Sequence, residues 1–357
     1  MLNSLNSWCA GNNMKINPSK SNVVHFRPPS VPRCNTTFVC GNAEIPLTDR
    51  YKYLGLVLTE HLDYAITAKV VAQSANRALG LVIAKTKSFG GLSYSVFTKL
   101  YESVVCPVIT YGAAIWGTED FSCINSVQYR AARFFLHVNK HTANAAVSGD
   151  IGWTPMECRL WKVIGTFWSR LANMSVERIN KRSVLWAKSK SSTSCRNWPY
   201  RVQRQFLSFG LEELCNMNVP MSKSVILMSL LPVVLNNFIR HWKEDLNRVS
   251  GKTGIGGNKL RTYRLFKHDF ETEIYCKNVW SAKHRGAIAK FRTGTAPIRL
   301  ETGRYESLPV SQRKCFNCDC VENEEHVLVN CPLYDDIRFE LFNKCHVCMS
   351  RIFRFYR

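Results

Sequence analysis

The fold is decided by the stretch Gly152-Trp153-Thr154-Pro155-Met156-Glu157, which predicts the start of a helix. Thr154 fits the N-cap, Pro155 the first helical position, and Glu157 the partner that completes a capping box. Apolar residues then repeat at steps of three and four: Leu160, Ile164, Phe167, Leu171 and Met174. This spacing predicts one amphipathic helix with a single buried face.

Working outward, weaker helical periodicity runs through residues 65–84, 92–105, 121–138 and 222–246. We therefore expect residues 62 to about 240 to be mostly helical. The first sixty residues differ, because short β-branched or aromatic runs stand at 23–26, 38–40 and 51–58, the last interrupted by Gly55. Runs of this kind, separated by turn residues, predict a small antiparallel sheet.

Two segments lack an apolar period and predict linkers. Residues 188–198 contain Ser-Lys-Ser-Ser-Thr-Ser, and residues 249–258 contain Ser-Gly-Lys-Thr-Gly-Ile-Gly-Gly. The expected organisation is a β segment at 1–60, a helical domain at 61–187, a linker and helical region at 188–248, a basic helical region at 249–312, and a Cys/His cluster with a terminal helix at 313–357.

The chain is strongly basic, with 48 Lys+Arg against 26 Asp+Glu, a net charge of +22 and a pI near 9.6. Such a field favours a polyanionic partner, either nucleic acid or an acidic membrane surface. We expect no membrane partner, because the longest near-apolar runs fall below the roughly 18 residues of a membrane helix and the apolar faces are needed for a core. The first residues carry no basic segment followed by an apolar block, so we expect a nuclear or cytoplasmic protein that is not secreted.

The basic residues gather in two clusters. Residues 178–211 hold eight Lys/Arg and no acid, with tryptophan, tyrosine and phenylalanine interleaved, and a second cluster runs from 259 to 304. Positive charge with interleaved rings suits phosphate neutralisation and base stacking, whereas a solvated face is the alternative for any single residue. The candidate nucleic-acid contacts are Arg196, Trp198, Arg201, Arg204, Lys259, Arg261, Arg264, Arg285, Lys290 and Arg292.

The sharpest local motif is Cys315-x2-Cys318-x7-His326-x4-Cys331. Fifteen cysteines in a chain without an export signal indicate thiols and metal ligands rather than a disulfide framework. A structural zinc ion takes four cysteine or histidine ligands in a tetrahedron, and this motif supplies four. We therefore expect one structural Zn²⁺.

Other interpretations of the cysteine-rich tail stay open. Cys345-x2-Cys348 is a second pair that could form a four-cysteine ribbon with the first, although the spacing is long for that fold. Cys320 is either not a ligand or an alternative ligand to Cys318. Cys315, Cys318, His326 and Cys331 could also be three free thiols and a free imidazole. Asp335 and the acid after it predict the start of a helix.

Several segments together resemble the reverse transcriptases of non-LTR (LINE-type) retrotransposons. Ser7-Trp8-Cys9 and Asn13-Met14-Lys15-Ile16-Asn17-Pro18-Ser19-Lys20, leading into Val23-Val24-His25-Phe26, are similar to the segment that follows the catalytic aspartates. Tyr51-Lys52-Tyr53-Leu54-Gly55-Leu56 resembles the strand at the palm–thumb junction. Leu100-Tyr101, Cys106-Pro107-Val108-Ile109-Thr110-Tyr111-Gly112 and Trp116 resemble the thumb helix. The Cys/His motif, with Tyr334 and Arg338 behind it, resembles the C-terminal zinc knuckle.

The resemblance implies an α+β, predominantly α-helical fold with a residual palm sheet, a helical thumb and a zinc knuckle. It implies a nucleic-acid-binding C-terminal part that grips template RNA and target DNA during target-primed reverse transcription, with other retroelement proteins as further partners. The family's catalytic carboxylates precede the segment matching Trp8, so we expect this chain not to polymerise alone. Two alternatives stay open: part of an active RNA-directed DNA polymerase whose catalytic part lies upstream, and a non-functional relic of a retroelement.

Overall fold

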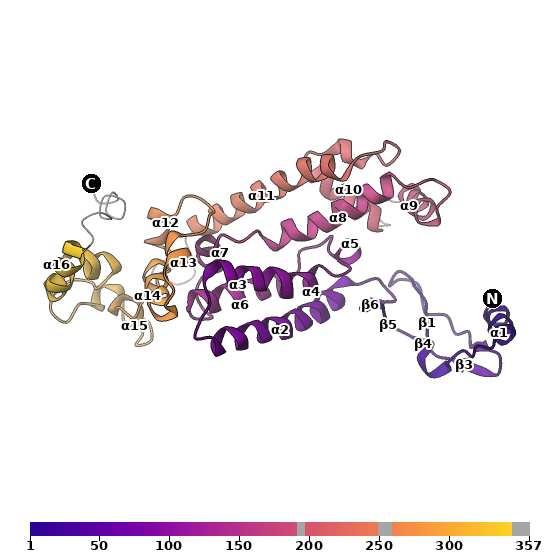
Figure 1. Cartoon of the computed structure of the whole chain (residues 1–357), viewed down its shortest axis with the longest axis horizontal. Coiled ribbons are helices and arrows are strands. Elements are labelled where there is room, and N and C mark those ends of the chain that lie inside the picture. The colour runs from indigo at the N-terminus through magenta and orange to yellow at the C-terminus, as the bar shows by residue number, and fades with distance from the viewer. Residues whose placement is uncertain (191–196, 249–258, 345–357) are drawn as a thin grey trace.

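The computed structural model describes residues 1–190, 197–248 and 259–344 of the chain. Most of its elements are helices, and they lie along an elongated molecule (Figure 1). Short strands occupy the N-terminal end, long helices form the middle, and the Cys/His segment lies at the other end near helix α16 (Asp335–Lys344). The expected class, α+β and predominantly α, is confirmed.

A helical body follows the N-terminal strands. It comprises α2 (Tyr64–Ser88), α3 (Tyr94–Leu100), the π-helical turn η2 (Tyr101–Val105), α4 (Cys106–Thr110), α5 (Ala113–Trp116), α6 (Ser122–Leu136), α7 (Asn144–Ile151) and α8 (Met156–Ala172). The face of α2 that carries Ala68, Ala75 and Leu79 is fully buried, and α2 packs on α6. Aromatic rings fill the space beside it, with Tyr101 stacked on Trp153 at 4.5 Å between ring centroids. Small residues on one helix and large rings on its neighbours therefore build this core.

A second core forms where α8 meets the following helices. These are α9 (Ile179–Ser189), α10 (Trp198–Ser208), the 3₁₀ turn η3 (Glu212–Cys215) and α11 (Lys223–Asn247). Helix α11 runs along α8 (Figure 1). A Cβ on Gly165 would lie 3.0 Å from Leu230 Cδ2, so the glycine permits this close approach. Of the described helices, α11 is long and apolar enough by length and composition to cross a bilayer, yet Ile226, Leu230 and Val234 are buried against its neighbours.

The helix predicted from the opening stretch is α8, but its N-cap differs from the prediction. Pro155 is the N-cap, and no side chain caps the helix. The Thr154 carbonyl instead accepts a hydrogen bond from Gln128 Nε2 at 3.0 Å, which ties this connection to α6. The predicted capping box does not form, because the N-cap position is taken by Pro155, whose side chain has no hydrogen-bond acceptor. The periodic segments at 65–84, 92–105, 121–138 and 222–246 are confirmed as α2, α3 with η2, α6 and α11.

The N-terminal segment departs further from its prediction. A helix, α1 (Leu2–Gly11), precedes the strands, and the expected single antiparallel sheet is wrong. Three two-stranded sheets form instead: parallel β1 (Val23–Val24) with β4 (Leu47–Thr48), and antiparallel β2 (Phe38–Cys40) with β3 (Ala43–Ile45) and β5 (Arg50–Tyr53) with β6 (Leu56–Thr59). Leu54 and Gly55 both have positive φ, as a tight two-residue hairpin requires, so Gly55 marks a turn between strands.

The C-terminal third consists of short elements. They are α12 (Tyr263–Phe266), α13 (Ile274–Asn278), α14 (Ala282–Arg292), α15 (Arg299–Thr302), η4 (Val310–Gln312), η5 (His326–Asn330), η6 (Pro332–Tyr334) and α16. Helix α16 begins at Asp335, as predicted. The second expected linker and residues 191–196 of the first lie outside the described residues, so the domain boundaries stay a prediction.

Candidate metal centre and nucleic-acid interface

Four side chains of the Cys/His motif converge. The ligand atoms of Cys315, Cys318, His326 and Cys331 all lie within 4.8 Å of one another. Cys331 Sγ lies 3.8 Å from Cys315 Sγ and 3.9 Å from Cys318 Sγ. Zn–S bonds of about 2.3 Å in a tetrahedron place two sulfurs about 3.8 Å apart. These side chains could therefore hold a metal ion, and three sulfurs with one imidazole nitrogen are a donor set that suits zinc.

Two local structures bring the ligands together. The first is a tight loop in which Cys315 N–H donates to the Cys320 carbonyl at 2.9 Å and residues 314 and 321 form an antiparallel bridge. The second is the π-helical turn η5, across which Cys331 N–H donates to the His326 carbonyl at 2.7 Å. Asn323 Oδ1 accepts from His326 N–H at 2.7 Å and fixes the start of that turn.

Two arginines anchor the ligand-bearing segments. Arg313 is fully buried, and its guanidinium donates to the Leu300 carbonyl at 3.0 Å and to the Leu308 carbonyl at 2.9 and 2.6 Å. Arg338 donates to the carbonyl of the ligand Cys331 and pairs with Asp335 in the first turn of α16. Charge-assisted hydrogen bonds of this kind are among the stronger polar contacts in proteins, so both segments are held in place around the cluster.

The cluster also favours a thiolate. Burial opposes ionisation of Cys315, but the backbone N–H of Asn317 and the His326 side chain outweigh it and lower the pKa of the Cys315 thiol to about 7. Burial raises the pKa of the Cys331 thiol. The thiolate is the form that binds a metal.

The remaining cysteines of the tail divide into two groups. Cys320 is exposed, and its Sγ lies 3.2 Å from His326 Nδ1, so it contacts the ring of one member of the four-residue cluster without belonging to the cluster. Cys345 and Cys348 lie outside the described residues, and the four-cysteine alternative stays open.

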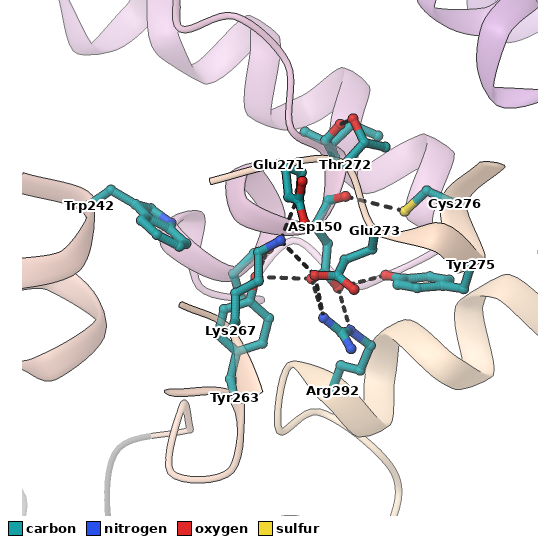
Figure 2. Close-up of polar contacts among 12 residues, drawn as sticks. Asp150, Trp242, Tyr263, Lys267, Glu271, Thr272, Glu273, Tyr275, Cys276 and Arg292 are labelled. Atoms are coloured by element: carbon teal, nitrogen blue, oxygen red, sulfur yellow. Dashed lines mark hydrogen bonds and ion pairs between the residues drawn. The ribbon is translucent and has the colours of Figure 1, made fainter. Parts of the chain in front are cut away.

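Arg292, a candidate nucleic-acid contact, lies in the buried polar network of Figure 2. Its guanidinium lies 3.0 and 3.2 Å from the two carboxylate oxygens of Asp150 and 3.0 Å from Glu273 Oε1. Asp150 is fully buried and also accepts from the hydroxyls of Tyr263 and Tyr275 at 2.9 and 2.7 Å. Burial opposes the Arg292 charge, but Asp150 outweighs it and raises the arginine pKa. Arg292 therefore links α14 to α7, and its assignment as a phosphate contact stays a prediction that this pairing does not favour.

Two further arginines of the second cluster serve the fold in the same way. Arg285 is buried, donates to the Phe135 carbonyl at 2.7 Å and lies 3.9 Å above the Phe135 ring centroid. Arg261 lies 3.0 Å from Glu301 and 2.5 Å from the buried Glu324, and so it ties the Cys/His segment to α15. These charges have partners inside the protein, so the structure does not favour either residue as a phosphate contact, and both assignments stay untested predictions.

In the first cluster, Trp198 belongs to the second core. Its ring lies 5.5 Å from Phe167 and 5.8 Å from Trp168, and Nε1 donates to the Ala114 carbonyl at 2.8 Å. These contacts occupy much of the ring, so the structure does not favour Trp198 as a stacking surface, and its assignment stays an untested prediction. Arg201 pairs with Glu119. Arg204 is exposed, Lys259, Arg264 and Lys290 are half-buried, and Arg196 lies outside the described residues.

Among the described residues, an exposed tryptophan stands beside exposed basic side chains on α9 and between α13 and α14, and neither tryptophan is in the list of candidate contacts. The first surface, which we call the α9 stripe, consists of Arg182 and Trp186 on α9 and Lys190 at its C-cap. These three residues are exposed and follow one another at steps of four, and Trp186 is 66% exposed. Between α13 and α14, the α13–α14 corner consists of exposed Lys277, Trp280 and Lys283, with Trp280 73% exposed. The four-residue spacing in the α9 stripe is visible in the sequence, whereas no local pattern marks Trp280 as exposed.

The Cys/His cluster carries another exposed ring. Phe316 stands between Cys315 and Cys318 and is 92% exposed, with the Arg299 guanidinium 5.9 Å from its ring centroid. Comparisons of the chain with protein-family models, with curated proteins and with solved structures found no match.

Proposed function

We propose that the chain binds single-stranded nucleic acid, RNA or DNA, as the C-terminal part of a non-LTR retrotransposon reverse transcriptase, in the nucleus or cytoplasm. One observation carries the proposal: tryptophan rings stand exposed between exposed basic side chains, in the α9 stripe and the α13–α14 corner. Proteins that bind single strands combine such charges for the phosphates with rings on which bases stack.

The charge balance supports the same partner. An internal ion pair such as Arg292 with Asp150 removes one positive and one negative charge together. The net charge of +22 is therefore unchanged by the buried pairs, and the excess lies in the remaining basic side chains. A surface of this kind attracts phosphate backbones and releases their counterions.

The metal centre supports a rigid nucleic-acid contact at the far end of the molecule. Cys315, Cys318, His326 and Cys331 would hold a structural zinc ion, which cross-links the loop and η5. That cross-link would fix the exposed ring of Phe316 as a further stacking surface. Arg299 beside this ring is paired with Glu306 at 2.6 and 2.8 Å, so the ring rather than the charge is the proposed contact. The proposed zinc knuckle is thus a scaffold for recognition and takes no part in a reaction.

The test is fluorescence anisotropy with a labelled single-stranded RNA of mixed sequence at rising salt. Trp186→Ala should weaken binding by about 1–3 kcal/mol, roughly five- to 150-fold, while leaving the salt dependence unchanged. Arg182→Ala should flatten the slope of log affinity against log salt by about 0.7.

A matched control exists on α2, where exposed Arg77, Leu81 and Lys85 have the same spacing as the α9 stripe, with a leucine in the place of Trp186. Leu81→Ala should leave the affinity unchanged. Binding that ignores salt, or equal losses for Trp186→Ala and Leu81→Ala, would contradict the proposal.

A further inference from the structure

A mostly enclosed cavity of about 180 Å³ lies between α6, α7, the start of α8 and α11. Aromatic side chains form much of its wall: Tyr129, Trp153, Phe238 and Phe270. Two carboxyl groups, of Asp120 and Glu157, and the imidazole of His241 also line it. Asp120 and His241 are exposed and stand where the cavity opens to solvent, whereas Glu157 is half-buried. Its lining residues include no lysine and no arginine, although the chain holds 48 of them. The cavity is thus acidic inside a basic protein.

Glu157 is the unusual member of this lining. It lies in the first turn of α8, and its carboxyl forms no hydrogen bond or ion pair with any of the described residues. The arginine two positions further on, Arg159, points to Glu102 instead, at 2.6 Å. Burial, and then the Asp120 carboxylate, raise the pKa of Glu157 to about 7 even though a helix start favours a negative charge. Glu157 is half-buried, and its carboxyl can lower the cost of partial burial either by holding a proton or by meeting a cation in the cavity.

We propose that this cavity binds an aliphatic ammonium ion, whose nitrogen donates to Glu157 and Asp120 and whose alkyl chain packs on the aromatic walls. An ammonium group has three N–H donors and can serve two carboxylates at once. Asp120 Oδ1 accepts from Asn125 Nδ2 at 2.8 Å, which holds that carboxylate while its other oxygen is left for a ligand. Aromatic faces attract cations further.

The volume limits the ligand to a small amine. An enclosed cavity of about 150 Å³ holds a molecule the size of benzene. A four-carbon amine such as n-butylammonium therefore matches the space, and a nucleic acid does not. The inference does not depend on the proposed nucleic-acid function, because it concerns a different surface and a ligand of opposite charge.

Calorimetric titration of the full chain with n-butylammonium tests the proposal, with n-butanol as the uncharged ligand of the same chain length. The amine should bind at least tenfold more tightly than the alcohol. Equal binding of the two would overturn the proposal in favour of an apolar cavity, and no heat from the amine at millimolar concentration would overturn it as well. This comparison uses the unaltered protein and does not depend on a variant that folds.

Variants then locate the site. Glu157→Gln and Asp120→Asn should each weaken amine binding at least tenfold while leaving n-butanol binding unchanged. Glu244→Gln, which alters an exposed acid on α11 outside the cavity lining, is the control and should bind the amine as the unaltered protein does. Amine binding that survives both cavity substitutions, or that is lost equally in Glu244→Gln, would refute the assignment.

Discussion

Replacing Asp150 by alanine should destabilise the junction between the helical body and the C-terminal third. The Asp150 carboxylate is fully buried and accepts from Arg292 twice, from Tyr263 and from Tyr275 (Figure 2). Removing one partner of a buried ion pair costs about 3–5 kcal/mol, because the other charge is left without compensation.

The structure places this loss at the lower end of that range. Arg292 keeps its contact with Glu273 at 3.0 Å, and the Tyr263 hydroxyl keeps the Ala146 carbonyl at 3.2 Å. Tyr275 is different, because Asp150 is the only hydrogen-bond partner of its hydroxyl among the described residues. We therefore expect a loss of about 3 kcal/mol in the free energy of unfolding for Asp150→Ala.

Urea denaturation followed by tryptophan fluorescence measures this loss. With a slope of about 3 kcal/mol per molar urea, the midpoint should fall by about 1 M. Hydrogen exchange should quicken in α12, α13 and α14 more than in α2, because the network joins the former to α7. Glu102→Ala, which breaks the more exposed pair with Arg159, is the control and should cost less than about 1 kcal/mol. A change below 1 kcal/mol for Asp150→Ala would refute the role assigned to the network.

Three further predictions concern the metal, the pH dependence and the chemistry. Elemental analysis of the purified protein should find about one zinc ion per chain. Cys318→Ser and His326→Ala should each lose this zinc, whereas Cys345→Ser should keep it. Loss of zinc only in Cys345→Ser would favour the four-cysteine ribbon. Burial raises the pKa of Glu157 to about 7, from an unfolded value near 4.3, so the native state binds this proton more tightly than the unfolded state does. The free energy of unfolding should therefore fall as the pH rises from about 4.3 to about 7. In denaturation curves Glu157→Gln should remove this fall, and an unchanged pH profile would argue against a buried carboxyl. The chain with Mg²⁺ should not extend a primer on an RNA template, because no residue of this sequence matches the catalytic aspartates of the family that it resembles. Incorporation above a heat-inactivated control would contradict this.

The sequence alone determined the features that depend on neighbours a few residues apart. The apolar period after Pro155 predicted α8, because a helix places every third or fourth side chain on one face. The spacing of Cys315, Cys318, His326 and Cys331 predicted that these side chains converge, because one loop and one helical turn bring all four together. The N-cap of α8 was less predictable, since a hydrogen bond from Gln128 on another helix holds that connection.

Only the tertiary structure decided which basic residues stand free for a partner. Arg285 and Arg292 share a basic segment with exposed Lys283, and nothing in their local pattern separates the three. The difference lies 142 residues away for Arg292, where Asp150 supplies a buried carboxylate, and 150 residues away for Arg285, where the Phe135 carbonyl accepts its hydrogen bond. A charge is buried only where a distant partner compensates for its lost hydration, and no local period in a sequence records where that partner lies.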